Sequence, residues 1–292
     1  MIGGERSWRH LLYVAPFLVF FLGLLVYPLL AGLSLSFDKA DLFGAHQFIG
    51  VENYRRLLHD EVFLGAVRNT LYFLALTVPA LTVIGLALAL ALALNRAGSL
   101  AMVLRGVFFA SSVLSVTIVT LLWRVMLSPG SGLLAGIARI FGREPVAFLN
   151  DPRLALPAIA VTTIWWCLGL PMMLFLAALQ QLPPELHEAA ALDSAGRWRT
   201  LWSITLPSIR RTFVLVLIIE IVLQFQLFGQ AQLMTRGGPN NSSRPIVLFI
   251  YETGFNRWDV GYASAASQAL FLLILAAAMG QYWVTRRDQG AS

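Results

Sequence analysis

Charged residues are scarce in this chain, and their scarcity excludes an ordinary water-soluble protein. Only 12% of the 292 residues are Asp, Glu, Lys or Arg. A soluble domain carries roughly twice that fraction. The hydrophobic fraction is 58% and the mean hydropathy is +0.73. So few charges cannot cover a surface that faces water, and most of the chain must therefore be solvated by a lipid bilayer.

Cysteine and clustered histidine are also nearly absent. The single cysteine, Cys167, lies inside an apolar stretch and has no second thiol with which to form an intrachain disulfide. The four histidines are scattered without the spacing of metal ligands, so we expect no metal site. No phosphate-binding GxxxxGK[ST] run occurs, and we therefore expect neither an enzyme nor a cofactor-binding chain.

The basic residues do not indicate a nucleic-acid partner, although the net charge is +6. Of the 21 basic residues, 20 are Arg and one is Lys39. They lie mostly at the ends of apolar stretches, as is typical of residues that flank lipid. We therefore attribute the charge to membrane topology.

Six apolar stretches are each 18 residues or longer, and a membrane-spanning helix needs roughly 20 residues. They cover residues 11–37, 70–94, 106–127, 154–179, 212–234 and 261–284. Glu220 in the fifth stretch and Arg124 near the end of the third are their only charged residues. No internal repeat or low-complexity linker separates them. The pattern predicts an all-α integral membrane protein with six transmembrane helices in one domain, residues 1–292.

Six crossings place both termini on the same side of the membrane. With the N-terminus inside, ten basic residues fall in the 61 inside residues and ten in the 84 outside residues. The higher inside density favours cytoplasmic termini. The first stretch has 27 apolar residues, against roughly 7–15 in a signal peptide, so we expect an uncleaved anchor.

The segment 183–207 is a helix-forming, charged insertion between the fourth and fifth stretches. Pro183 and Pro184 end the fourth span and suit the first turn of a new helix. Asp193 is a candidate N-cap for a second helix, which we expect to end at Pro207. The second helix should carry an apolar face made of Trp198, Leu201, Trp202 and Thr205. An amphipathic loop that rests on lipid headgroups is the alternative.

Two motifs in this segment resemble a known signature. Glu188-Ala189-Ala190 and Ile204-x-Leu206-Pro207 match the EAA motif of permease subunits in binding-protein-dependent ABC importers. Further matching runs are APFLVFFLGLLVYPLL, FIGVENYRRLL with a later Asn69-Thr70, LMTRGGPNNSS, YETGF and GYASAAS. With these runs, the chain resembles the six-span A/F-type subunits of sugar and glycerol-3-phosphate importers along nearly its whole length.

This resemblance implies a type I ABC importer permease fold in a bacterial inner membrane, with a cytoplasmic coupling helix. The implied ATPase contacts are Glu188, Ala189, Ala190, Asp193, Ser194, Gly196, Leu206 and Pro207. Ser194 stands where the signature has glycine, so the geometry of this turn stays open. The implied partners are a second permease subunit, two ABC ATPase subunits that bind ATP and Mg²⁺, and an extracytoplasmic solute-binding protein.

Polar residues in the fifth stretch are candidates for a substrate path. Glu220, Gln224, Gln226 and Gln230 would share one sector of about 160° on a continuous helix. Amides donate to and accept from neutral polyols without fixing a charge. Glu220 could instead pair with Arg210 or Arg211.

Two other sets of residues are candidate contact sites. Trp165 and Trp166 could stack on a sugar ring, or they could pack within the span. Gly238, Pro239, Asn240 and Asn241 could contact the solute-binding protein, or they could form a turn.

The sequence therefore predicts the permease subunit of an ATP-driven importer that moves a sugar by alternating access. A glycerol-3-phosphate or phosphodiester importer remains an alternative. A self-sufficient secondary transporter would need its own ion-coupling groups and repeated halves, and only Glu220 qualifies. A membrane-embedded enzyme would need a His, Asp and Ser cluster, but the six stretches contain no His or Asp.

Overall fold

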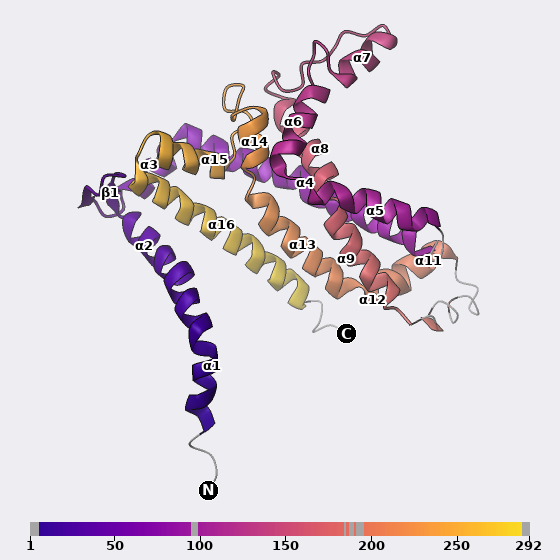
Figure 1. The fold of residues 1–292 in the computed structure, drawn as a ribbon, viewed down its shortest axis with the longest axis horizontal. Helices are drawn as coiled ribbons and strands as arrows, with labels where there is room; N and C mark the ends of the chain where they lie inside the picture. The colour runs from indigo at the N-terminus through magenta and orange to yellow at the C-terminus, as the bar shows by residue number, and fades with distance from the viewer. Residues whose placement is uncertain (1–5, 95–98, 184, 187–189, 191–195, 288–292) are drawn as a thin grey trace. The chain divides into compact units, whose positions relative to one another are not determined.

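The computed structural model describes residues 6–94, 99–183, 185–186, 190 and 196–287. These residues are helical except for connecting loops and one two-stranded sheet (Figure 1). The chain divides into two compact units. Unit 1 comprises residues 1–61 and 249–271, and unit 2 comprises residues 62–248 and 272–292.

Unit 1 begins with a long apolar helix that contains one widened turn. It consists of α1 (Arg6–Phe21), the π-helical turn η1 (Leu22–Val26) and α2 (Tyr27–Leu35). Pro28 lies in the first turn of α2, directly after η1. A π-helical turn breaks the regular i→i−4 ladder, so the missing N–H of Pro28 falls where that ladder is already interrupted.

A small polar and aromatic subdomain follows this helix. It contains the antiparallel strands β1 (Asp38–Ala40) and β2 (His46–Phe48), and then α3 (Glu52–His59). The buried side-chain amide of Asn53 donates to the carbonyl oxygens of Ser36 at 3.0 Å and Asp38 at 2.9 Å. These two bonds hold α3 against the end of the first span.

The same unit contains η3 (Glu252–Asn256) and the start of α16 (Val260–Arg287), which follow α15 (Ile246–Tyr251). Arg56 of α3 approaches the Asp259 carboxylate at 3.3 Å. The guanidinium of Arg56 also lies 4.2 Å from the ring centroid of Tyr262, whose hydroxyl donates to Asp60 at 2.9 Å. One arginine thus joins α3 to the first turn of α16 by an ion pair and a cation–π contact.

Apart from Glu61 at the start of α4, unit 2 contains the other helices whose bounds the structure describes. They are α4 (Glu61–Leu94), α5 (Ser99–Val113), α6 (Val116–Met126), α7 (Leu133–Ile140), α8 (Ala155–Cys167), α9 (Gly169–Gln180), α11 (Arg197–Thr200), η2 (Leu201–Thr205), α12 (Leu206–Ser208), α13 (Arg210–Phe225) and α14 (Gly229–Met234). One buried cluster forms around Phe73 and Ile159, and a second forms around Met172, Phe175 and Val216. The first joins α4, α8 and α14, and the second joins α4, α9 and α13.

Among the described residues, three helices are long and apolar enough to cross a membrane. They cover Tyr13–Leu35, Glu61–Ala93 and Val260–Gln281. Two bent pairs raise this number to five: Met102–Val113 with Val116–Met126, and Ala155–Cys167 with Gly169–Gln180. The predicted fifth span falls on α13 and α14, which have 16 and 6 residues.

Three of the six predicted stretches are therefore interrupted rather than continuous. The bend between α5 and α6 is 101°, and the bend between α8 and α9 is 43° (Figure 1). At the first bend, the Ser112 hydroxyl donates to the carbonyl of Trp166 at 3.0 Å, and the Trp166 indole donates to the carbonyl of Leu114. Hydroxyl and indole groups thus satisfy backbone groups that a broken helix would leave exposed to lipid.

Close approach of backbones accompanies these interruptions. A Cβ atom on Gly169 would lie 2.6 Å from the Ser112 oxygen and 2.8 Å from the carbonyl oxygen of Phe108. A Cβ atom on Gly229 would lie 2.9 Å from a methyl carbon of Val116. Glycine therefore lets α9 approach α5, and lets α14 approach α6, more closely than any larger residue would allow.

Candidate functional site

The segment predicted to couple to an ATPase is described only in part. Glu188, Ala189, Asp193 and Ser194 lie outside the described residues. Ala190 is buried, whereas Gly196 is exposed. The structure therefore describes four of the eight predicted contacts: Ala190, Gly196, Leu206 and Pro207.

The second helix of this segment ends at Ser208, one residue beyond the Pro207 at which we expected it to end. Pro207 lies in the first turn of α12, and the helix continues to Ser208 before a break at Ile209. The preceding turn η2 is π-helical, which shifts the hydrogen bonds near the proline ring. The Ser208 hydroxyl also donates to the carbonyl of Ile204 at 2.7 Å. The widened turn and the serine thus accommodate the proline inside a helix.

The predicted apolar face of this helix does not pack as a unit within the chain. Trp198 is 75% exposed and Trp202 is 66% exposed, whereas Thr205 is 5% exposed. The spacing rule assumed 3.6 residues per turn, and the π-helical turn changes that register. The two tryptophans are consequently free to contact lipid or another chain.

The four polar residues predicted to share one helical sector lie on two helices. Glu220 and Gln224 belong to α13, Gln226 caps its end, and Gln230 belongs to α14. Glu220 is 1% exposed, and its carboxylate accepts a hydrogen bond from the Gln224 amide at 3.1 Å. The Gln230 amide donates to the Thr163 hydroxyl of α8 at 3.5 Å, and Gln226 is exposed.

The alternative pairing of Glu220 with Arg210 or Arg211 does not hold in this structure. Both arginines begin α13, and Glu220 follows ten and nine residues later on the same helix. A rise of about 1.5 Å per residue separates their backbones by about 14–15 Å, too far for an ion pair. Glu220 is instead buried beside Gln224.

The paired tryptophans have different environments. The indole N–H of Trp166 donates to the carbonyl of Leu114 at 3.0 Å, so its polar group supports the α5–α6 bend. Trp165 is 41% exposed and forms an edge-to-face pair with Trp123, with ring centroids 5.9 Å apart. Of the two, Trp165 is the side chain that still presents an aromatic surface.

Two polar groups that the sequence analysis did not select lie near these residues. Within the described part of the chain, the buried Trp123 Nε1 and the buried Gln232 Oε1 have no hydrogen-bond partner. Trp123 belongs to α6 and Gln232 to α14, and these two helices pack against each other. The only sign in the sequence was the position of Gln232 two residues after Gln230.

The predicted receptor-docking residues form an ordered loop. Asn240 and Asn241 have φ angles of 50° and 60°, a left-handed conformation that asparagine tolerates better than most residues. The Ser243 hydroxyl donates to the carbonyl of Gly238 at 2.6 Å and also contacts the Thr235 hydroxyl at 2.7 Å. These bonds fix the loop across its base.

Asn69 and Thr70 of α4, which are not part of this loop, form hydrogen bonds to its backbone. The Asn69 side-chain amide donates to the carbonyl oxygens of Asn241 at 2.7 Å and Arg244 at 3.0 Å. The Thr70 hydroxyl accepts a hydrogen bond from the backbone N–H of Ile246 at 3.0 Å. Two motifs far apart in sequence thus form one structure.

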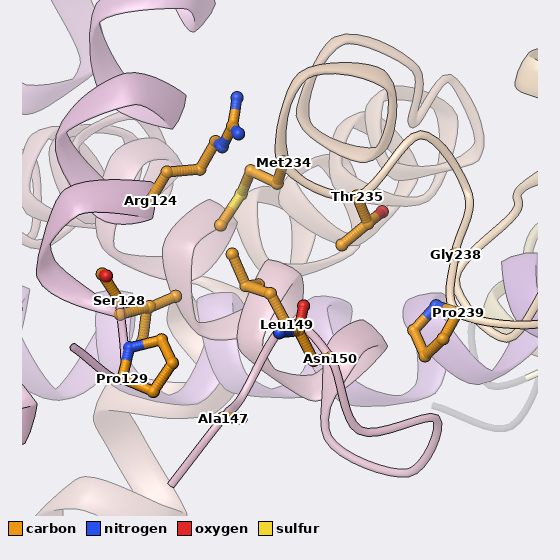
Figure 2. Close-up of a pocket in the computed structure, with 11 residues that line it drawn as sticks. Arg124, Ser128, Pro129, Ala147, Leu149, Asn150, Met234, Thr235, Gly238 and Pro239 are labelled. Carbon is orange, nitrogen blue, oxygen red and sulfur yellow. The ribbon is translucent and has the colours of Figure 1, made fainter. Parts of the chain in front are cut away.

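A hollow of about 480 Å³ lies beside this loop (Figure 2). It is lined by Arg124, Leu127, Ser128, Pro129, Ala147, Leu149, Asn150, Met234, Thr235, Gly238 and Pro239. Figure 2 shows Leu149 and Asn150 between the Ser128–Pro129 turn and Pro239. Arg124 is the one charged residue of this lining, and its guanidinium donates to the carbonyl of Leu233 at 3.1 Å.

The sequence of this chain matches one protein family and is similar to several transport proteins. Residues 67–288 match the family described as "Binding-protein-dependent transport system inner membrane component". The diacetylchitobiose uptake system permease protein NgcF of Streptomyces coelicolor is 32% identical, over 99% of this chain and 88% of the relative. The sulfoquinovosyl glycerol transport system permease protein SmoG of Agrobacterium fabrum is 30% identical, over 92% and 87%.

A solved structure matches over almost the whole chain. It is a chain of a bacterial alginate ABC transporter in complex with an alginate pentasaccharide-bound periplasmic protein. The TM-score is 0.83 at 26% identity, and the match covers 97% of this chain and 96% of that chain.

Proposed function

This chain belongs to the family of binding-protein-dependent transport system inner membrane components, and we propose that it carries a sugar or sugar derivative across the membrane in an ATP-driven importer. The curated relatives NgcF and SmoG and the alginate transporter are all named for sugar-containing solutes. These names support sugar as the substrate class without specifying one sugar.

The observation that carries this proposal is the set of uncharged hydrogen-bonding groups in the interrupted helices of unit 2. The Gln230 amide donates to the Thr163 hydroxyl across a long distance of 3.5 Å. Among the described residues, the buried Trp123 Nε1 and Gln232 Oε1 have no hydrogen-bond partner. Buried polar groups without partners are costly, and the hydroxyls of a sugar can both donate to and accept from them. These groups and the exposed ring of Trp165 would form part of the path.

The loop 183–207 would transmit ATP hydrolysis to this path. In this proposal the loop faces the cytoplasm and binds a separate ABC ATPase, which holds ATP and Mg²⁺. The helix that contains Pro207 leads into α13 with one short break at Ile209. Motion of the loop would therefore move the helix that carries Glu220 and Gln224.

The remaining partners follow from the same proposal. A second permease subunit would complete the path, and a solute-binding protein would dock on the loop formed by Gly238, Pro239, Asn240 and Asn241. The match of this chain to a chain of a transporter whose structure was solved with a periplasmic protein supports such a partner. Both termini would lie in the cytoplasm of a bacterium, with the chain in the inner membrane.

Reconstituted transport tests this proposal. The chain, co-expressed with its permease and ATPase partners, is placed in proteoliposomes with the solute-binding protein, and ATP-dependent uptake of labelled sugars is measured. We expect uptake of at least one sugar that requires ATP, and loss of that uptake in Gln232→Leu. Uptake driven by an ion gradient without ATP would instead indicate a secondary transporter. Competition by glycerol-3-phosphate but not by neutral sugars would indicate a phosphate-ester importer.

A further inference from the structure

Unit 1 exposes a group of large apolar side chains at the end of its membrane-spanning helices. Phe43 is 77% exposed, Phe255 is 62% exposed, Leu42 is 50% exposed and Trp258 is 49% exposed. We call these four residues the aromatic tip. Leu42 and Phe43 lie in the turn between β1 and β2, and Phe255 and Trp258 lie between α15 and α16.

The turn that carries Leu42 and Phe43 is held by an acidic side chain. The Asp41 carboxylate accepts hydrogen bonds from the backbone N–H groups of Phe43 at 2.9 Å and Ala45 at 3.1 Å. The Asp41 N–H also donates to the carbonyl of Ala45 at 3.1 Å. Because the carboxylate is used for backbone bonding, the turn has a fixed shape and presents its apolar side chains outward.

The two halves of the aromatic tip contact each other. The rings of Phe43 and Trp258 pack edge to face, with centroids 5.1 Å apart and an angle of 73°. Trp258 has a φ angle of 60°, which is rare for a bulky residue. The next residue, Asp259, is held by its 3.3 Å ion pair with Arg56. The structure thus fixes an exposed indole in an unfavourable backbone conformation.

Contacts within unit 1 show where the aromatic tip lies relative to the two candidate spans. The apolar span Tyr13–Leu35 ends three residues before β1, and the span Val260–Gln281 begins two residues after Trp258. A Cβ atom on Gly261 would overlap the carbonyl oxygen of Asp38, so the start of α16 lies directly against β1. The aromatic tip therefore lies beside the ends of both candidate spans.

We infer that the aromatic tip inserts into the lipid–water interface of the membrane. Aromatic side chains are enriched at this boundary because their rings prefer an environment between hydrocarbon and water. A rigid turn lowers the entropic cost of placing Phe43 there. The aromatic tip contacts the phospholipids themselves, in the region between their ester groups and their first acyl carbons.

Site-specific fluorescence tests this inference in the full-length chain reconstituted in lipid nanodiscs. Phe43→Cys is labelled with a bimane dye, and the nanodiscs contain phosphatidylcholine brominated either near the headgroup or near the end of the acyl chain. Gln47→Cys is the matched control, since residue 47 is an exposed residue in the same hairpin. Wild-type protein labelled in parallel gives the background from Cys167.

We expect the label at position 43 to lose most of its fluorescence with bromine near the headgroup, and less with bromine near the acyl end. The label at position 47 should keep most of its fluorescence in both lipids. Adding Asp41→Ala to Phe43→Cys should weaken the quenching, because it releases the turn while keeping the label. Equal quenching at positions 43 and 47, no quenching at position 43, or stronger quenching by the deeper bromine would each overturn the inference. A label at position 43 that is shielded from lipid and responds only to an added solute-binding protein would assign the surface to that protein instead.

Discussion

The side-chain amide of Asn69 lies 2.7 Å from the carbonyl oxygen of Asn241, 172 residues along the chain. The same amide holds the carbonyl of Arg244, and the neighbouring Thr70 holds the N–H of Ile246. One turn of α4 therefore helps to hold the loop that we propose as the receptor contact.

Asn69→Ala should loosen this loop without blocking membrane insertion. The change removes two part-buried hydrogen bonds, and each contributes about 0.5–1.5 kcal/mol to stability. We expect a lower midpoint of thermal unfolding in detergent and weaker stimulation of ATP hydrolysis by the solute-binding protein. Arg68→Ala is the control, because Arg68 is exposed on the same turn. If both variants behave like wild type, Asn69 does not position the loop.

Trp166→Phe should destabilise the bend between α5 and α6. The phenyl ring fills most of the same space but cannot donate to the carbonyl of Leu114, which then loses its 3.0 Å partner. We expect a loss of about 1 kcal/mol in the free energy of unfolding. Trp165→Phe should be milder, since a phenyl ring can retain the edge contact with Trp123. Equal effects of the two changes would contradict the assigned role of the indole N–H.

Gly169→Ala should disturb the packing of α9 on α5. The added methyl group would lie within 3 Å of the Ser112 hydroxyl and the Phe108 carbonyl, so the helices must separate. Such overpacking costs about 1–3 kcal/mol. Gly106→Ala on α5 is the matched change, because a Cβ there meets no atom within 4 Å. Size-exclusion profiles and unfolding midpoints of the two purified variants distinguish them, and a well-behaved Gly169→Ala would show that the contact can relax.

Gln224→Leu should destabilise the chain more than the double change Glu220→Leu with Gln224→Leu. The single change leaves the fully buried Glu220 carboxyl without its amide donor, whereas the double change removes both polar groups. Removal of one partner of a buried pair costs about 1–3 kcal/mol, and removal of both can be nearly neutral. Chemical unfolding of the four proteins in this cycle gives the coupling energy. A coupling energy near zero would show that the two residues act independently.

Glu188→Arg should uncouple ATP hydrolysis from uptake while the protein still inserts and assembles. The resemblance to the EAA motif implies that this glutamate contacts a basic residue of the ATPase. Glu185→Arg makes the same change in charge three residues earlier, at an exposed position, and should be tolerated better. Uptake and ATP hydrolysis are measured in the same proteoliposomes. Normal uptake by Glu188→Arg would remove the coupling role from this residue.

The sequence located the apolar stretches because length and hydropathy are properties of each stretch alone. The stretches 11–37, 70–94 and 261–284 fall on the continuous helices of the candidate spans. The breaks at Leu114, Leu168 and Gln226 could not be located in this way, since they depend on contacts between helices. Serine hydroxyls, an indole and close glycines satisfy or permit each break, and their neighbours are distant in sequence.

The candidate site was likewise predictable only in its composition. The glutamines of the fifth stretch were evident from the sequence, but their distribution over α13 and α14 depends on where the helix ends. The hydrogen bond of Trp166 to Leu114 is also a tertiary property, and so is the lack of a partner for the Trp123 indole N–H among the residues that the structure describes. The binding of Asn69 to the 238–244 loop joins two motifs that the sequence presented separately.

The π-helical turn at Leu201–Thr205 changes how a displacement would travel through the protein. A helix that ended well before Pro207 would place a longer flexible joint between the loop 183–207 and α13, and movement at one end would be lost there. Because the helix ends only at Ser208 and α13 begins at Arg210, a displacement of α11 would reach α13 across a break of a single residue, Ile209. The size of the resulting displacement of α13 would then depend on the backbone geometry at this one break.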